Sequence, residues 1–213
     1  MITDFIIQAE KTEDARWFVF FTSWNYTACV VYFVAITIQN GIFVFKKKKS
    51  FSERLLNKEE YSSTGNLIDE STEDDDQLTG ADKFVWLMFN ITLPACFCVV
   101  VAFWSIIYGP NTNVTFFTVD RHGIDLVLIL VDFSLHKIPV RVLHFVYPTT
   151  FLILYMIFSV IFSHATDFII YSAVDWRKNP TKSTLLFLAL IIASGVVHFI
   201  FYWIDRLLSL IHI

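Results

Sequence analysis

Long apolar stretches alternate with short polar ones along this chain. Four stretches contain no Asp, Glu, Lys or Arg, and the shortest of them has 22 residues. A helix needs about 20 mainly apolar residues to cross the hydrocarbon core of a bilayer. The four stretches are residues 17–45, 84–119, 142–166 and 183–204. The pattern therefore predicts an all-α, polytopic membrane protein.

Residues that favour the edges of a membrane set the expected helix ends. Trp17 suits the headgroup level, and Lys46 begins a polar stretch. The dipeptide at Gly109 and Pro110 is a turn signal. We expect spanning helices over residues 17–45, 84–108, 142–163 and 183–204.

Residues 114–135 form a fifth element of a different character. Charged residues and a histidine lie in its first half, so it must face protein or a wet cavity, either as a spanning helix or as a re-entrant one. These residues are Asp120, Arg121, His122 and Asp125. Asp132 lies near the other end, where we expect a solvated carboxylate. The prediction is a transmembrane bundle of about five spanning helices.

Composition agrees with a membrane protein and excludes other classes. Hydrophobic residues make up 55% of the chain and charged residues 17%, against roughly 25% charged in soluble domains. No broad basic face is present, so nucleic-acid binding is excluded. Cys29, Cys96 and Cys98 all lie in apolar stretches, where we expect buried small side chains rather than a disulfide framework or a zinc site. We expect no metal and no cofactor.

Charge is distributed unevenly, and this sets an orientation. Nine of the 20 acidic residues lie between Glu59 and Asp82, so we expect residues 46–83 to be an acidic loop without stable structure. With five crossings, ten basic residues lie on one side and six on the other. The side richer in Lys and Arg faces the cytoplasm. The loop 46–83 and the tail 205–213 are then cytoplasmic, and residues 1–16, 109–113 and 164–182 are exterior. Asn113 begins a glycosylation sequon on the exterior side.

Thr22 and His122 are the candidate catalytic residues. Thr22 lies about one turn into the first helix and His122 near the start of the element 114–135. Both elements begin on the exterior side, so the two residues should have similar depths. A hydroxyl near a histidine is the smallest set of groups for nucleophilic catalysis. Asp125, one turn from His122, is a candidate for orienting its ring.

Structural roles are the alternative for the same residues. A threonine in a membrane helix usually hydrogen-bonds the carbonyl one turn back. His122 and Asp125 would then be a polar cluster exposed to headgroup water.

Several segments together resemble a known family. Residues 17–25 are WFVFFTSWN, residues 122–148 are HGIDLVLILVDFSLHKIPVRVLHFVYP, and residues 169–180 are IIYSAVDWRKNP. These segments resemble the rolling stone proteins, which are related to the androgen-induced membrane proteins. The resemblance extends from Arg16 to Trp203, apart from the acidic loop.

The resemblance implies functions that composition does not show. Rolling stone is associated with myoblast fusion in insects. The androgen-induced relatives are integral-membrane hydrolases of fatty-acid esters of hydroxy fatty acids, and their catalytic Thr and His match Thr22 and His122. The rolling stone pattern generally has Asn where this chain has Asp125. The relatives also have one further N-terminal helix, which makes six.

Two functions follow as expectations. One is a Thr/His lipid esterase that acts on fatty-acid esters, and the alternative is a non-catalytic membrane protein in cell fusion or adhesion. The expected partners are the lipid bilayer and, for the esterase, an acyl-ester lipid substrate. The expected location is the plasma membrane or the endoplasmic reticulum. The sequence makes no statement about oligomeric state.

The orientation is testable by cysteine labelling. We expect an impermeant maleimide to leave a Ser63→Cys variant unlabelled in intact cells, because the charge count places the acidic loop in the cytoplasm. Permeabilised cells should label fully and serve as the control. Labelling of intact cells would reverse the orientation.

Overall fold

The computed structural model describes residues 17–61, 79–109, 114–135, 138–166 and 168–211. Within these ranges the structure is helical, apart from one isolated β-bridge between Tyr171 and Val174, and the predicted all-α fold is confirmed. Four helical segments are long and apolar enough to cross a membrane. They are Phe21–Lys49, Gly80–Ile107, Val142–Ala165 and Pro180–Leu210.

Some helices are regular and others are short or wide turns. The long α-helices are α3 (Phe21–Tyr61), α4 (Gly80–Ala102), α7 (Val146–Ala165) and α8 (Pro180–Ile211). The shorter α-helices are α5 (Phe116–Val119) and α6 (Asp125–Leu135). Two π-helical turns, η2 (Phe103–Ile107) and η3 (Asp120–Ile124), and two 3₁₀ turns, η1 (Trp17–Val19) and η4 (Val142–Phe145), complete the order.

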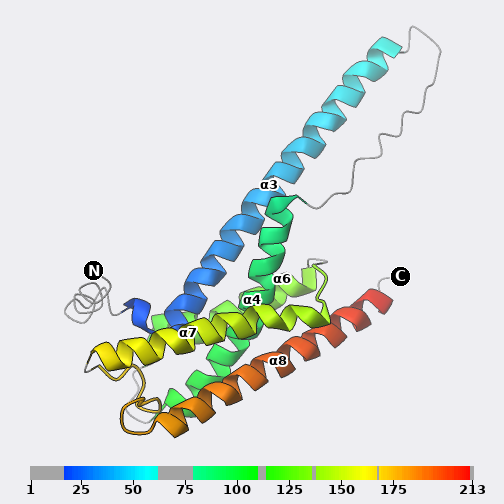
Figure 1. Ribbon diagram of the computed structural model, residues 1–213. Coiled ribbons are helices and arrows are strands. Elements are labelled where there is room, and N and C mark those ends of the chain that lie inside the picture. Colours follow the sequence, from blue (N-terminus) through cyan, green and yellow to red (C-terminus); the bar gives the residue numbers. More distant parts are fainter. Residues whose placement is uncertain (1–16, 62–78, 110–113, 136–137, 167, 212–213) are drawn as a thin grey trace.

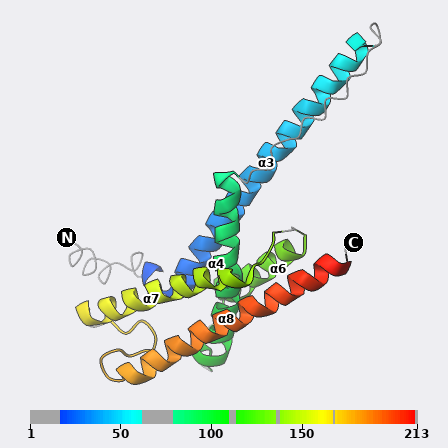
Figure 2. The same cartoon turned by 45° about the vertical axis from the view of Figure 1, so that its right-hand side comes forward.

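Helix α4 is the centre of the bundle. It packs against α3, α6, α7 and α8. In its most apolar stretch 56% of the residues are buried, whereas the corresponding share is 17% in α3 and 28% in both α7 and α8. Helices α7 and α8 run side by side and cross α4 at a steep inclination (Figures 1 and 2). The remaining helices therefore expose one apolar face each to the surroundings, as lipid-facing helices do.

Helix α3 is longer than the sequence pattern predicts. Residues 46–61, which we expected to belong to an unstructured loop, continue the helix for 41 residues in total, or about 60 Å at 1.5 Å per residue. Lys, Glu, Leu and Arg dominate this part, and all are strong helix formers. The far end of α3 consequently projects beyond the other helices (Figure 1). The rest of the acidic loop, residues 62–78, lies outside the described residues.

The element 114–135 crosses the bundle beside α4. At one end the indole N–H of Trp104 donates to the carbonyl of His122 at 2.8 Å. At the other end the indole N–H of Trp86 donates to the carbonyl of Pro139 at 2.7 Å. Trp86 and Trp104 are separated by 18 residues of helix, or about 27 Å. The chain from His122 to Pro139 therefore runs antiparallel to α4.

Both carboxylates of α6 are buried, which corrects the expectation for Asp132. Asp125 is 7% exposed and Asp132 is 8% exposed. The hydroxyl of Tyr32, itself fully buried on α3, donates a hydrogen bond to the carboxylate of Asp132. A carboxylate inside an apolar medium is costly unless it is paired or hydrogen-bonded, so α6 turns this face toward α3.

Removing the Tyr32 hydroxyl should destabilise the fold. We expect Tyr32→Phe to lower the free energy of unfolding by about 1–3 kcal/mol, because a buried carboxylate loses a donor. Thermal unfolding of the purified protein in detergent measures the change. Tyr147→Phe is the matched control, since Tyr147 is exposed. Equal effects of the two variants would contradict a stabilising role for the Tyr32–Asp132 bond.

Candidate functional site

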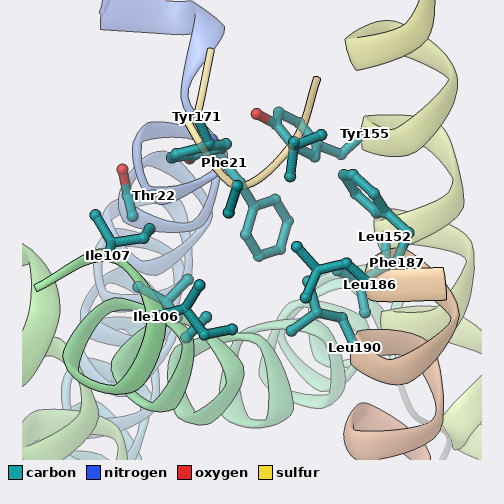
Figure 3. A pocket seen from close by; sticks show the side chains of 14 residues that line it. Phe21, Thr22, Ile106, Ile107, Leu152, Tyr155, Tyr171, Leu186, Phe187 and Leu190 are labelled. Atoms are coloured by element: carbon teal, nitrogen blue, oxygen red, sulfur yellow. The ribbon is translucent and has the colours of Figure 1, made fainter. Parts of the chain in front are cut away.

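A pocket opens at the end of the bundle where α3 begins, and we call it the α3-start pocket. The space within it that a water molecule can enter is about 60 Å³. Its lining residues are Phe21, Thr22, Val99, Ala102, Ile106, Ile107, Leu152, Tyr155, Tyr171, Ala173, Val174, Leu186, Phe187 and Leu190. The Phe21 ring points into the middle, with Thr22 on one side and leucines of α8 on the other (Figure 3). Only three lining side chains are polar, and each carries a hydroxyl.

Those hydroxyls surround the first turn of α3. The backbone N–H of Phe21 donates to the hydroxyl of Tyr171 at 2.9 Å. Tyr155 donates to the carbonyl of Val19 at 2.9 Å, and Thr22, Tyr155 and Tyr171 line the same pocket. The first N–H groups of a helix lack partners within it. The hydroxyl of Tyr171, in the connector between α7 and α8, supplies the acceptor for one of these N–H groups.

Burial of Tyr171 fixes its chemical form. The removal of its ring and hydroxyl from water raises the pKa of Tyr171 above its ordinary value. The phenol therefore stays protonated at physiological pH. It is a constant hydrogen-bond acceptor for the Phe21 N–H, next to Thr22 at the pocket wall.

His122 lies at the same end of the bundle, in the π-helical turn η3. Its backbone departs from helical geometry, with φ −125° and ψ 20°. Its ring packs on that of Phe103 with a centroid distance of 3.7 Å, and its Nδ1 atom is buried without a hydrogen-bond partner. The neighbouring Arg121 guanidinium lies 5.8 Å from the centroid of the Trp17 ring. This contact joins the turn η3 to the start of α3, where Thr22 is located.

The structure does not join the three candidate residues by direct bonds. His122 is absent from the wall of the α3-start pocket, and no hydrogen bond links it to Thr22, although the structure describes both residues. The Oδ2 atom of Asp125 has no hydrogen-bond partner, and neither has Nδ1 of His122, so these two atoms are not bonded to each other. Asn113 lies outside the described residues.

Wide turns flank this end of the bundle. His122 belongs to the π-turn η3, whereas Phe103 and Trp104 belong to the π-turn η2. The carbonyl of His122 accepts the Trp104 indole N–H, so a hydrogen bond links the two irregular turns. Ile106 and Ile107 of η2 also line the α3-start pocket. Such turns inside helices occur frequently at functional sites.

A second buried polar group was not predicted from the sequence. The Sγ atoms of Cys29 and Cys96 are 3.2 Å apart as free thiols, and the amide of Asn25 donates to Sγ of Cys96 at 3.4 Å. The predicted burial of the cysteines is confirmed. Asn25 and Cys29 are four residues apart and therefore share one face of α3. The sequence alone does not show that Cys96 of α4 lies opposite them. Within the described ranges, no group of three His, Cys, Asp or Glu is arranged to hold a metal.

These features define the class of the protein: a multi-pass helical membrane protein with an apolar pocket bordered by hydroxyl groups. The family model described as "Protein rolling stone" matches residues 2–212, and the chain belongs to this family. It is similar to "Protein rolling stone" of Drosophila melanogaster, with 24% identity over 208 residues, which covers 92% of this chain and 70% of that protein. No solved structure matches. The resemblance inferred from the residues is confirmed.

Tyr171→Phe tests the hydroxyl arrangement. We expect a loss of about 1–3 kcal/mol in the free energy of unfolding, because the Phe21 N–H loses its acceptor in a buried setting. Tyr108→Phe, an exposed tyrosine at the end of η2, is the control. Thermal unfolding in detergent measures both. A loss no greater than that of the control would show that the Tyr171 hydroxyl does not hold the start of α3.

Proposed function

We propose that the protein is an integral-membrane esterase that hydrolyses fatty-acid esters with Thr22 as the nucleophile. The observation that carries this proposal is the position of the Thr22 hydroxyl at the wall of an otherwise apolar pocket. The apolar lining suits an acyl chain, since burying each CH₂ group contributes about 0.8 kcal/mol. Thr22 is the second residue of α3, the first membrane helix, at a depth where water is available for hydrolysis.

The reaction proceeds through an acyl-enzyme. The Thr22 oxygen attacks the ester carbonyl while His122 accepts the hydroxyl proton. The tetrahedral intermediate collapses, the C–O bond to the alcohol breaks, and His122 returns the proton to the departing alcohol. Water then attacks the acyl-threonine with His122 again as the base. The fatty acid leaves and Thr22 recovers its proton.

Three features support His122 as the base. It lies at the same end of the bundle as Thr22, its Nδ1 atom has no hydrogen-bond partner, and it belongs to an irregular turn. Hydrogen bonds between catalytic groups are often long or poorly aligned in substrate-free enzymes and tighten when substrate binds. In this proposal an ester in the pocket brings Thr22 and His122 into contact.

Two further residues would position the pair. Tyr171 fixes the first turn of α3, and with it Thr22, by accepting the Phe21 N–H at 2.9 Å. Asp125, three residues after His122 and buried, would orient the imidazole once the ring turns toward Thr22. On the charge-based orientation, the site lies in the exterior or luminal leaflet of the plasma membrane or the endoplasmic reticulum.

Hydrolysis by purified variants tests the proposal. At equal expression, we expect both Thr22→Ala and His122→Ala to lower turnover of a branched fatty-acid ester by about 10²-fold or more, the usual effect of losing a catalytic group. Thr27→Ala is the matched control, because Thr27 is an exposed threonine on the same helix that donates only to its own backbone at Ser23. It should retain wild-type turnover.

Two results would contradict the esterase. Unchanged turnover in both Thr22→Ala and His122→Ala would reject the pair. An inactive wild-type protein that is correctly folded would favour the alternative, a non-catalytic role in cell fusion or adhesion.

A further inference from the structure

A second pocket lies at the opposite end of the bundle, and we call it the lysine-end pocket. It forms where α3 reaches its four lysines, where α4 begins, and where the chain passes from α6 to α7, and its volume is about 1540 Å³, including space open to the surroundings. Lys46, Arg141 and Trp86 stand among the polar lining groups, and Ile38, Ile42 and Phe43 among the apolar ones. The proposed esterase does not use this pocket.

Two cations face it without an acidic partner. Neither Lys46 nor Arg141 makes a salt bridge with a carboxylate of the described chain. Arg141 is nevertheless held in place, because its guanidinium lies 5.1 Å from the centroid of the Trp86 ring. The same Trp86 donates its indole N–H to the carbonyl of Pro139 at 2.7 Å. The pocket therefore presents one positioned and one flexible positive charge.

The single carboxylate on the wall is already occupied. Asp82 accepts the backbone N–H of Thr79 at 2.8 Å and its hydroxyl at 2.7 Å, in the capping box of α4. The side-chain amide of Gln39 also donates to Asp82. These neutral donors satisfy the carboxylate and the start of α4, while the lining holds two cations against this one carboxylate. Lys46 and Arg141 leave the pocket with an excess of positive charge.

Apolar side chains continue from the cations toward the middle of the bundle. Ile38 is 57% exposed, Ile42 is 52% exposed and Phe43 is 65% exposed. Within α3, Ile38 and Ile42 are four residues apart and thus share one helix face with Lys46, four residues further on. This face passes from an apolar strip to a cation over two turns. A molecule with a charged head and hydrocarbon chains has the same polarity.

We propose that the lysine-end pocket binds an anionic phospholipid. Its phosphate lies between Lys46 and Arg141, and an acyl chain follows Ile42 and Ile38 along α3. Basic pockets between helices on the cytoplasmic side bind acidic lipid headgroups, and anionic lipids are concentrated in that leaflet. The positive-inside rule places the lysine end in the same leaflet. Charge and apolar surface together therefore point to a phospholipid rather than a soluble anion.

Lipid binding by the full-length purified protein tests this site. Native mass spectrometry compares phosphatidylserine with phosphatidylcholine of the same acyl chains. We expect the wild type to bind phosphatidylserine more tightly, and the double variant Lys46→Gln with Arg141→Gln to lose about 30-fold in affinity, given roughly 1 kcal/mol for each of the two cations near a membrane surface. The matched control is Lys47→Gln with Lys48→Gln, which removes the same charge from residues that do not line the pocket. It should change affinity less than the pocket variant.

Several outcomes would overturn the site. If both double variants lost the same affinity for phosphatidylserine, the lipid would be attracted to the lysine run in general and not to the pocket. If the wild type bound phosphatidylserine and phosphatidylcholine equally well, the positive charges would have no role in binding. Displacement of the lipid by glycerophosphoserine alone would show that the acyl chains contribute nothing.

If the pocket variant fails to fold, cross-linking decides. Photoactivatable phosphatidylserine should modify wild-type residues 38–46 or 138–141, and modification confined to other segments would reject the proposal. The charge-preserving variant Lys46→Arg with Arg141→Lys should retain the preference for phosphatidylserine.

Discussion

A bilayer offers no hydrogen-bond partner to a polar group, and the arrangement of this bundle follows from that constraint. Polar side chains in the apolar segments turn toward the interior around α4. The hydroxyl of Tyr32 meets the carboxylate of Asp132, and the amide of Asn25 meets the thiol of Cys96. The outward faces of α3, α7 and α8 carry Val, Ile, Leu and Phe instead. The pairing of polar groups thus determines which face of each helix is buried.

The same constraint divides the two ends of the bundle by chemistry. At the start of α3, the hydroxyl of Tyr171 accepts the Phe21 N–H and that of Tyr155 donates to the Val19 carbonyl, beside an apolar pocket that Thr22 also lines. At the lysine end, cations and a capped helix terminus border a pocket open to a charged ligand. Tryptophans anchor both ends, since Trp104 and Trp86 each donate to a backbone carbonyl of the crossing segment. The two ends are thus the places of the two proposed sites, one for an acyl ester and one for an anionic lipid headgroup.

The sequence pattern did not predict the irregular turns and connector that shape the candidate site. Sequence reasoning selected Thr22 and His122 by depth and by resemblance, and the structure places them at one end of the bundle. It did not anticipate that η3 would be a π-turn that packs the His122 ring against Phe103. It also missed Tyr171, because this residue lies in a connector and meets Phe21 across 150 positions of sequence. No local pattern encodes such a contact.

Sequence alone determined the properties that depend on consecutive residues. The number and length of the apolar segments, the all-α membrane class and the family all follow from local composition and motifs, because an apolar run of sufficient length favours a bilayer regardless of its neighbours. The burial of Asp132, the position of α6 beside α4, and the contact of Tyr171 with Phe21 were decided by the tertiary structure. Each of these depends on which helix faces which. That choice is made by pairing polar groups and packing side chains between segments far apart in the chain.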